Sequence, residues 1–166
     1  MSEWIKHLAS RIKEVDHEAA EKLHADARRK GILDAKGPVF YKETVTAIQR
    51  DLKLMEEDLK EDVTGFPTTV STPNAVLATI GRQACPFVTA TFQLMMPQEQ
   101  IVLSGSTGNP VKGIAVRQHG LTFRFEIGEN DGVFVAEPFG EQSKKFHHPN
   151  QLAEHIVKLL FSVDPA

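Results

Sequence analysis

The chain has 166 residues, of which 41% are hydrophobic and 25% are charged. This length and composition are typical of one globular domain spanning residues 1–166, and they exclude an intrinsically disordered chain. The net charge is -3, with 12 basic against 14 acidic residues in 1–62 and 7 against 8 in 63–166. Neither part has the excess of Lys and Arg that nucleic acid requires, so we expect no nucleic-acid partner.

The sequence also bears on the cellular location. No apolar run approaches the roughly 18 residues that a membrane-spanning helix needs, and the charged N-terminus lacks the apolar region of a secretory signal. Because Cys85 is the only cysteine, no disulfide can form within the chain, which favours a reducing compartment. We therefore expect a cytoplasmic protein without a membrane partner.

Residues 1–62 place apolar side chains at helical spacing in two stretches. The first stretch consists of Ile5, Leu8, Ile12, Val15, Ala19, Leu23 and Ala27, and the second of Tyr41, Val45, Ile48, Leu52, Met55 and Leu59. Gly31 is suited to end a first helix, and Gly37-Pro38 is suited to begin a second one. Because the connection between them is short, the pattern predicts an antiparallel helical hairpin.

Residues 63–148 are typical of β-strands. In "PFVTATFQLM", Val88, Ala90 and Phe92 alternate with polar residues, and "LTFRFEIG" alternates in the same way from residue 121. This alternation predicts a sheet with one buried face and one exposed face. Shorter strands are expected at 75–81, 100–104, 113–118 and 132–137, with turns at His119-Gly120 and at "ENDG", the best hairpin signal in the chain.

Residues 149–166 predict a C-terminal helix, with Asn150 as its N-terminal cap and an apolar face of Leu152, Ile156, Leu159, Leu160 and Val163. The predicted fold class is therefore α+β. It consists of an N-terminal antiparallel helical hairpin (1–62), a mostly antiparallel five- or six-stranded sheet (63–148) and a C-terminal helix packed on the sheet (149–166).

Three groups of residues invite a functional interpretation. "SGSTGNPVKG" (104–113) is rich in glycine, but its spacing differs from that of a phosphate-binding loop and a strand follows it, so we interpret it as a connection between strands with Gly108 and Asn109 in the turn. His17, Glu21 and His24 share one helix face, yet three ligands on a solvated face do not close a zinc site. Arg82 is near Cys85 in the sequence and His119 could be near it in space, but nothing in the sequence fixes either of them where it would activate a thiolate. No metal and no catalytic residue is predicted.

Residues 77–92, "LATIGRQACPFVTATF", resemble the first hairpin of the pyridoxamine-phosphate-oxidase-like flavin-binding split barrels. An apolar strand that ends in Leu-Ala-Thr precedes a turn and a Pro-x-Val-Thr sequence. The resemblance implies an oxidoreductase whose flavin phosphate would be held by Ser104, Ser106, Thr107 and Lys112. It extends over about a tenth of the chain and provides an alternative prediction.

The predicted sheet provides the main functional argument. Five strands span about 24 Å, whereas one helix covers only about 10 Å, so something else must cover the apolar face. Our first hypothesis is a non-catalytic assembly protein without a cofactor that forms a homodimer through its N-terminal helices, or else binds another protein. The predicted interface consists of Tyr41, Val45, Ile48, Leu52, Met55 and Leu59.

The alternative hypothesis is that a small apolar ligand binds between the sheet and the C-terminal helix. The pocket would be lined by Phe92, Met95, Phe123, Phe125 and Leu160.

Overall fold

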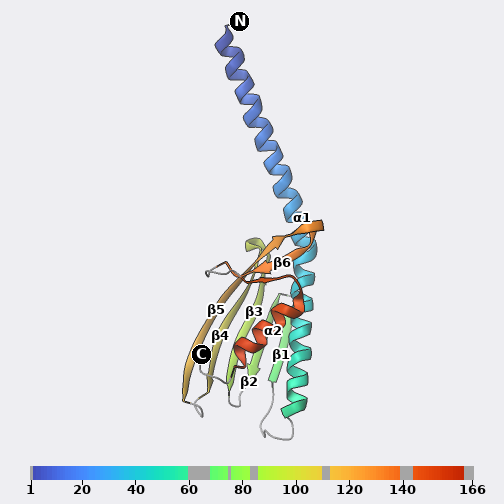
Figure 1. Cartoon of the computed structure of the whole chain (residues 1–166), viewed down its shortest axis with the longest axis vertical. Helices are drawn as coiled ribbons and strands as arrows, with labels where there is room; N and C mark the ends of the chain where they lie inside the picture. The colour runs from blue at the N-terminus through green and yellow to red at the C-terminus, as the bar shows by residue number, and fades with distance from the viewer. Residues whose placement is uncertain are drawn as a thin grey trace.

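A computed structural model describes residues 2–59, 68–74, 76–82, 86–109, 113–138 and 144–162. Within these residues, two α-helices and seven strands follow one another (Figure 1). Helix α1 spans Glu3–Leu59 and helix α2 spans Pro149–Leu160. The strands are β1 Thr68–Asn74, β2 Leu77–Arg82, β3 Phe87–Met95, β4 Gln100–Asn109, β5 Ile114–Ile127, β6 Val133–Ala136 and β7 Lys145–Phe146. The α+β class and the C-terminal helix on the sheet are confirmed.

The predicted helical hairpin is wrong, because α1 is one continuous helix of 57 residues. Neither Gly31 nor Gly37 has the positive φ angle that a glycine adopts when it ends a helix. Pro38 lies inside the helix, where its missing N–H removes one hydrogen bond without turning the chain back. The glycines and the proline therefore do not mark a connection here.

Packing explains why the helix continues through Gly37. A Cβ atom at this position would lie 3.1 Å from Met96 Sδ and 3.6 Å from the ring of Phe125, so glycine allows α1 to approach the sheet closely. Leu33, one turn earlier, and Phe40, one turn later, are both buried. The apolar contacts on both sides of Gly37 thus hold a single helix against the sheet and outweigh the local preference for a break.

The sheet is an antiparallel meander in which the seven strands lie in chain order. The hairpin predicted at "ENDG" is confirmed, since Ile127 pairs with Val133 across the turn between β5 and β6. His119 and Gly120, predicted as a turn, instead lie inside the 14-residue strand β5, where Gly120 pairs with Ser104. The prediction of five or six strands missed β1 and the two-residue β7.

The two faces of the sheet differ as the alternation predicted. Val88, Ala90, Phe92 and Leu94 of β3 are buried, whereas the residues between them are exposed. The same buried face contains Ile101 and Leu103 of β4, Phe123 and Phe125 of β5, and Ala78 and Ile80 of β2. Both helices cover this face, so the core lies between the sheet and the two helices (Figure 1).

The second half of α1 supplies the cover that α2 alone could not provide. Tyr41 stacks on Phe92 with 5.2 Å between ring centroids, and its hydroxyl donates a hydrogen bond of 2.6 Å to the Phe92 carbonyl. Burial raises the pKa of Tyr41 to about 12, so the hydroxyl remains protonated and able to donate. Phe40 meets Phe125 edge to face at 6.0 Å. The chain therefore covers most of its apolar sheet face by itself.

Helix α2 packs beside α1 through Leu152, Ala153, Ile156 and Leu160, all of them buried. Its N-cap is His148 and not the predicted Asn150, because Pro149 occupies the first helical position. The side chain of Gln151 accepts hydrogen bonds from the backbone N–H groups of His147 and His148.

The continuous helix predicts the effect of Gly31→Ala. Nothing lies within 4 Å of a Cβ atom built at Gly31, and alanine is the better helix former by about 0.5–1 kcal/mol in a helix interior. We expect the variant to unfold at higher denaturant concentration and to keep or gain helical circular dichroism. Destabilisation by alanine would instead indicate that the chain turns at this glycine.

The sheet register predicts that Phe123→Ala and Thr122→Ala differ strongly. Phe123 has no exposed surface, and truncating a buried phenylalanine costs about 3–5 kcal/mol in unfolding free energy. Thr122 lies on the opposite face and is only partly buried, so its truncation should cost less than about 1 kcal/mol. Chemical denaturation of the two variants measures both values, and similar losses would contradict the register.

Candidate functional site

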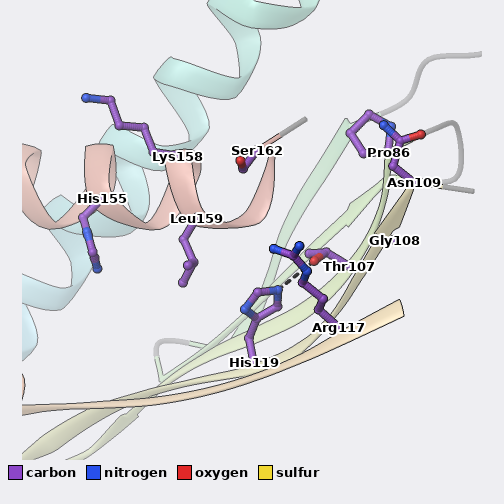
Figure 2. Close-up of a pocket in the computed structure, with 10 residues that line it drawn as sticks. All are labelled: Pro86, Thr107, Gly108, Asn109, Arg117, His119, His155, Lys158, Leu159 and Ser162. Atoms are coloured by element: carbon purple, nitrogen blue, oxygen red, sulfur yellow. Dashed lines mark hydrogen bonds between the residues drawn. The ribbon is translucent and has the colours of Figure 1, made fainter. Parts of the chain in front are cut away.

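A cavity of about 300 Å³ opens between the C-terminal end of α2 and strands β4 and β5 (Figure 2). It lies on the helix-covered side of the sheet, where β4 and β5 extend beyond α2. The cavity is lined by Pro86, Thr107, Gly108, Asn109, Arg117, His119, His155, Lys158, Leu159 and Ser162. This cavity thus lies between the sheet and the C-terminal helix, but it is not the apolar pocket of the ligand hypothesis, and most of the residues that line it are polar.

Strand pairing brings the polar residues of the cavity together. Thr107 pairs with Arg117 across β4 and β5, and His119 follows Arg117 on the same face of β5. The Thr107 hydroxyl and His119 Nε2 lie 2.7 Å apart and form a hydrogen bond (Figure 2). The hydroxyl, the imidazole and the guanidinium therefore lie next to one another on one wall of the cavity.

The electrostatic environment of His119 differs from that of an exposed histidine. Partial burial and the positive charge of Arg117, in that order, hold the pKa of His119 below its ordinary value of 6.5. The imidazole is consequently neutral at pH 7. A neutral histidine can either accept the hydrogen bond from the Thr107 hydroxyl or donate one to it, depending on the tautomer.

None of the residues described around the cavity is acidic. Two carboxylates contact residues of the lining from outside it: Glu137 contacts His155 at 3.0 Å, and Glu154 contacts Lys158 at 2.6 Å along the helix. The chain as a whole has more acidic than basic residues, so this basic lining is a local feature.

The residues predicted to line an apolar pocket form the core instead. Phe92, Phe123, Phe125 and Leu160 are at most 1% exposed, and Met95 is partly exposed at the end of β3. None of the five lines the cavity near α2. These side chains are packed in the core between the sheet and the two helices.

The residues predicted to form a dimer interface are also used within the chain. Tyr41, Val45, Ile48 and Leu52 are 1–5% exposed because they pack on the sheet. Met55 is partly buried against the same core, and the side chain of Leu59 lies outside the described residues. Their regular spacing reflects a helix docked on its own sheet, so these residues leave little surface for a second chain.

The glycine-rich stretch 104–113 is mostly strand. Ser104 to Asn109 belong to β4, so Gly108 and Asn109 are not in the turn, and Gly113 has the positive φ angle of 69° that a turn requires. Gly105 has no room for a Cβ atom, which would collide with the carbonyl oxygen of Thr89. The prediction of a connection is therefore wrong for residues 104–109, whereas the expected strand does follow the stretch as β5.

The residues that the flavin resemblance assigns to phosphate binding do not converge. Residues 77–92 do include an antiparallel β2–β3 pair. However, Ser104 pairs with exposed Thr91, whereas Thr107 pairs with buried Val88, so the two hydroxyls lie on opposite faces of the sheet. Lys112 and Cys85 lie outside the described residues.

The predicted histidine face on α1 is solvent-exposed. His17 contacts Glu21 at 3.2 Å, and both side chains are more than two-thirds exposed. No group of three His, Cys, Asp or Glu side chains in the described parts of the chain could hold a metal ion.

A second candidate site is the first half of α1, which projects away from the sheet (Figure 1). Every residue from Ser2 to Arg28 is exposed. The apolar side chains on this half are 40–71% exposed, and they include Trp4, Ile5, Leu8, Ile12, Val15 and Leu23. We call Ile5, Leu8, Ile12, Val15 and Ala19 the exposed seam. No described helix is long and apolar enough to cross a membrane.

Polar contacts fix the point at which α1 leaves the sheet. Arg28 donates to both carboxylate oxygens of Asp131 at 3.0 and 3.1 Å, and Arg29 contacts Glu99 at 3.0 Å. Lys36 donates to the Asp131 carbonyl at 2.6 Å. Such exposed pairs add little stability, but they orient the helix at its exit from the domain.

Sequence reasoning identified the exposed seam as helical but missed the cavity. From the sequence, Arg117 is expected in a strand over 113–118 and His119 in a turn with Gly120. The alternation of residues 121–127 does not extend through 115–120, because polar Arg117 and His119 take the positions of the inner face, so the sequence pattern provides no signal for one long strand. Residues at spacing two along one strand would have placed both side chains on one face.

Comparisons with protein-family models, with the sequences of curated proteins and with solved structures give no match to this chain. The two candidate sites therefore rest on their own geometry.

The position of Arg117 predicts how the pKa of His119 responds to mutation. Arg117→Gln removes the smaller of the two causes, so the pKa of His119 should rise but remain below 6.5. Arg124→Gln, on the opposite face of the same strand, should leave it unchanged. NMR titration of the imidazole protons measures both values.

The same low pKa predicts how the stability of the fold depends on pH. Because the pKa of His119 is lower in the folded chain than in the unfolded chain, the free energy of unfolding should decrease as the pH falls below about 6.5.

Proposed function

We propose that this chain is an assembly protein that forms a homodimer through the exposed seam on the first half of α1. The observation that carries the proposal is the run of apolar residues on a helix that projects into solvent, each at least 40% exposed where the side chain is large. This interface differs from the one expected from the sequence, because the second half of α1 is occupied by its own sheet.

A partner is required on physical grounds. Residues 3–28 form about seven helical turns, about 39 Å long, that contact no other part of the described chain except near Arg28. Helices in proteins gain most of their stability by packing an apolar face, and an isolated helix in water is marginally stable. An ordered projecting helix with one apolar face is therefore expected to pack against another surface.

The charge pattern favours a second copy of the chain over a lipid surface. Residues 3–28 contain five basic and six acidic residues, whereas helices that lie on anionic membranes are rich in Lys and Arg. The exposed seam follows the 3,4 spacing of a coiled coil. Arg11 and Glu18 lie along one side of the exposed seam, and Asp16 lies along the other side. Each helix therefore presents both positive and negative side chains next to the seam, where they can pair with those of a second copy.

Side-chain sizes favour an antiparallel pair. If Ile12 faces Val15 of the second copy, then Leu8 faces Ala19, and in these two pairs a larger side chain meets a smaller one. In this register Ile5 lies opposite Lys22 of the second copy. The same register places Arg11 near Glu18 of the second copy, where opposite charges attract. A parallel pair would instead place Ala19 against Ala19 and Lys22 against Lys22, which loses packing and sets like charges together. An antiparallel pair also keeps the two sheet domains at opposite ends.

Light scattering of Ile12→Asp tests the interface. The wild-type chain should have twice its chain mass of 18.4 kDa at micromolar concentration, and the variant should have the mass of a single chain. Burying an unpaired carboxylate in the seam costs several kcal/mol, whereas folding of the sheet domain is not affected, since Ile12 contacts none of it. Ser10→Asp adds the same charge on the opposite face of the helix and should remain dimeric.

Disulfide crosslinking tests the orientation in a Cys85→Ser background. Ile5→Cys combined with Lys22→Cys should crosslink two chains, because these positions face each other in the antiparallel pair. Ile5→Cys alone should not crosslink. Efficient crosslinking of the single variant would show a parallel pair, and a wild-type mass of 18.4 kDa at all concentrations would reject the dimer.

A further inference from the structure

We infer that the cavity between α2 and the β4–β5 pair binds a small organic anion, with its charged oxygens at Arg117, Thr107 and His119 and its apolar part against Leu159 and Pro86. This inference is independent of the proposed dimer, because the cavity lies on the sheet domain and contains no residue of the exposed seam.

Arg117 is the group that attracts the anion. Its guanidinium makes no hydrogen bond and no ion pair with any residue that the structure describes, whereas Arg28, Arg29 and Arg50 each contact a carboxylate. It projects from β5 into the space below the end of α2 (Figure 2). A guanidinium presents several donors in one plane, an arrangement that matches the two oxygens of a carboxylate or a phosphate.

The groups beside Arg117 complete the polar wall. The Thr107 hydroxyl can donate to an anion while it accepts a hydrogen bond from His119. Burial and Arg117 hold the pKa of His119 low, and an anion at Arg117 would counter the second of these causes by adding a negative charge beside the imidazole. Occupation of the cavity should therefore raise the pKa of His119 and favour its charged form.

Two apolar residues of the lining bear on the class of ligand. Leu159 extends from α2 toward His119 and Arg117, and buried Pro86 lies on the opposite side (Figure 2). These residues can contact a short apolar body but offer no hydrogen-bond donor. A cavity of about 300 Å³ lies at the lower end of the size range of small-molecule sites. The lining thus suits an anionic head on a short hydrocarbon or ring better than a bare inorganic ion.

The polar groups that face the cavity wall of His119 come from three elements. Arg117 lies on its own strand, and His155 and Lys158 line the cavity from α2, where their partners are Glu137 and Glu154. Thr107 on β4 is uncharged. No acidic residue is among the described residues that line the cavity, and the carboxylates of Glu137 and Glu154 already have partners. Protonation of His119 should therefore strengthen anion binding as the pH falls through its pKa.

Titration with hexanoate, followed by NMR of the folded full-length chain, tests the inference. Resonances of residues 107–109 and 117–119 should shift, and hexanol, which has the same apolar body without the charge, should bind at least about tenfold more weakly. Inorganic phosphate should also bind more weakly than hexanoate because it lacks the apolar body. Hexanoate should raise the pKa of His119, and its affinity should increase between pH 7.5 and pH 5.5.

Two matched variants decide the outcome. Arg117→Gln should weaken hexanoate binding by about tenfold or more, as expected for the loss of a charge-assisted hydrogen bond. Arg124→Gln, on the opposite face of β5, should bind like the wild type. An unchanged affinity in Arg117→Gln, or equal binding of hexanol and hexanoate, would overturn the inference. Tighter binding of inorganic phosphate than of hexanoate would reject the organic class. Circular dichroism of both variants verifies that they remain folded.

Discussion

Tyr41 holds α1 against the centre of the sheet, through a stack on Phe92 and a hydrogen bond of 2.6 Å to the Phe92 carbonyl. This contact lies in the middle of the buried part of α1, which extends from Leu33 to Leu52. A meander of seven strands presents an apolar face wider than one helix can cover. The docking of α1 beside α2 is therefore the constraint on which the rest of the structure depends.

Docking of the second half of α1 determines what its first half can do. Helix α1 continues without a break through Gly31. The polar contacts of Arg28, Arg29 and Lys36 orient its first half away from the sheet. The first half then has no surface of its own chain to pack on. Its apolar side chains are exposed because the second half already covers the sheet, and this is the basis for proposing a second copy as partner.

The cavity arises from a difference in length between the layers. Strand β5 has 14 residues and β4 has 10, whereas α2 has only 12 residues at the shorter rise of a helix. The strands consequently extend past the helix, and the side chains on that part of the inner face are Thr107, Arg117 and His119 instead of phenylalanines. The same face of one sheet thus provides the core under the helices and a polar wall beyond them.

The sequence by itself determined the α+β class, the buried face of β3 and β5, the hairpin at "ENDG" and the helical character of both ends. These features follow from local periodicity and turn chemistry, which neighbouring residues decide. Only the tertiary structure decided that Gly31 and Gly37-Pro38 lie inside one helix, because contacts with Met96 and Phe125 outweigh local propensity. It also decided which apolar seam is buried and which is exposed. Both seams have the same spacing, and only the position of the sheet distinguishes them.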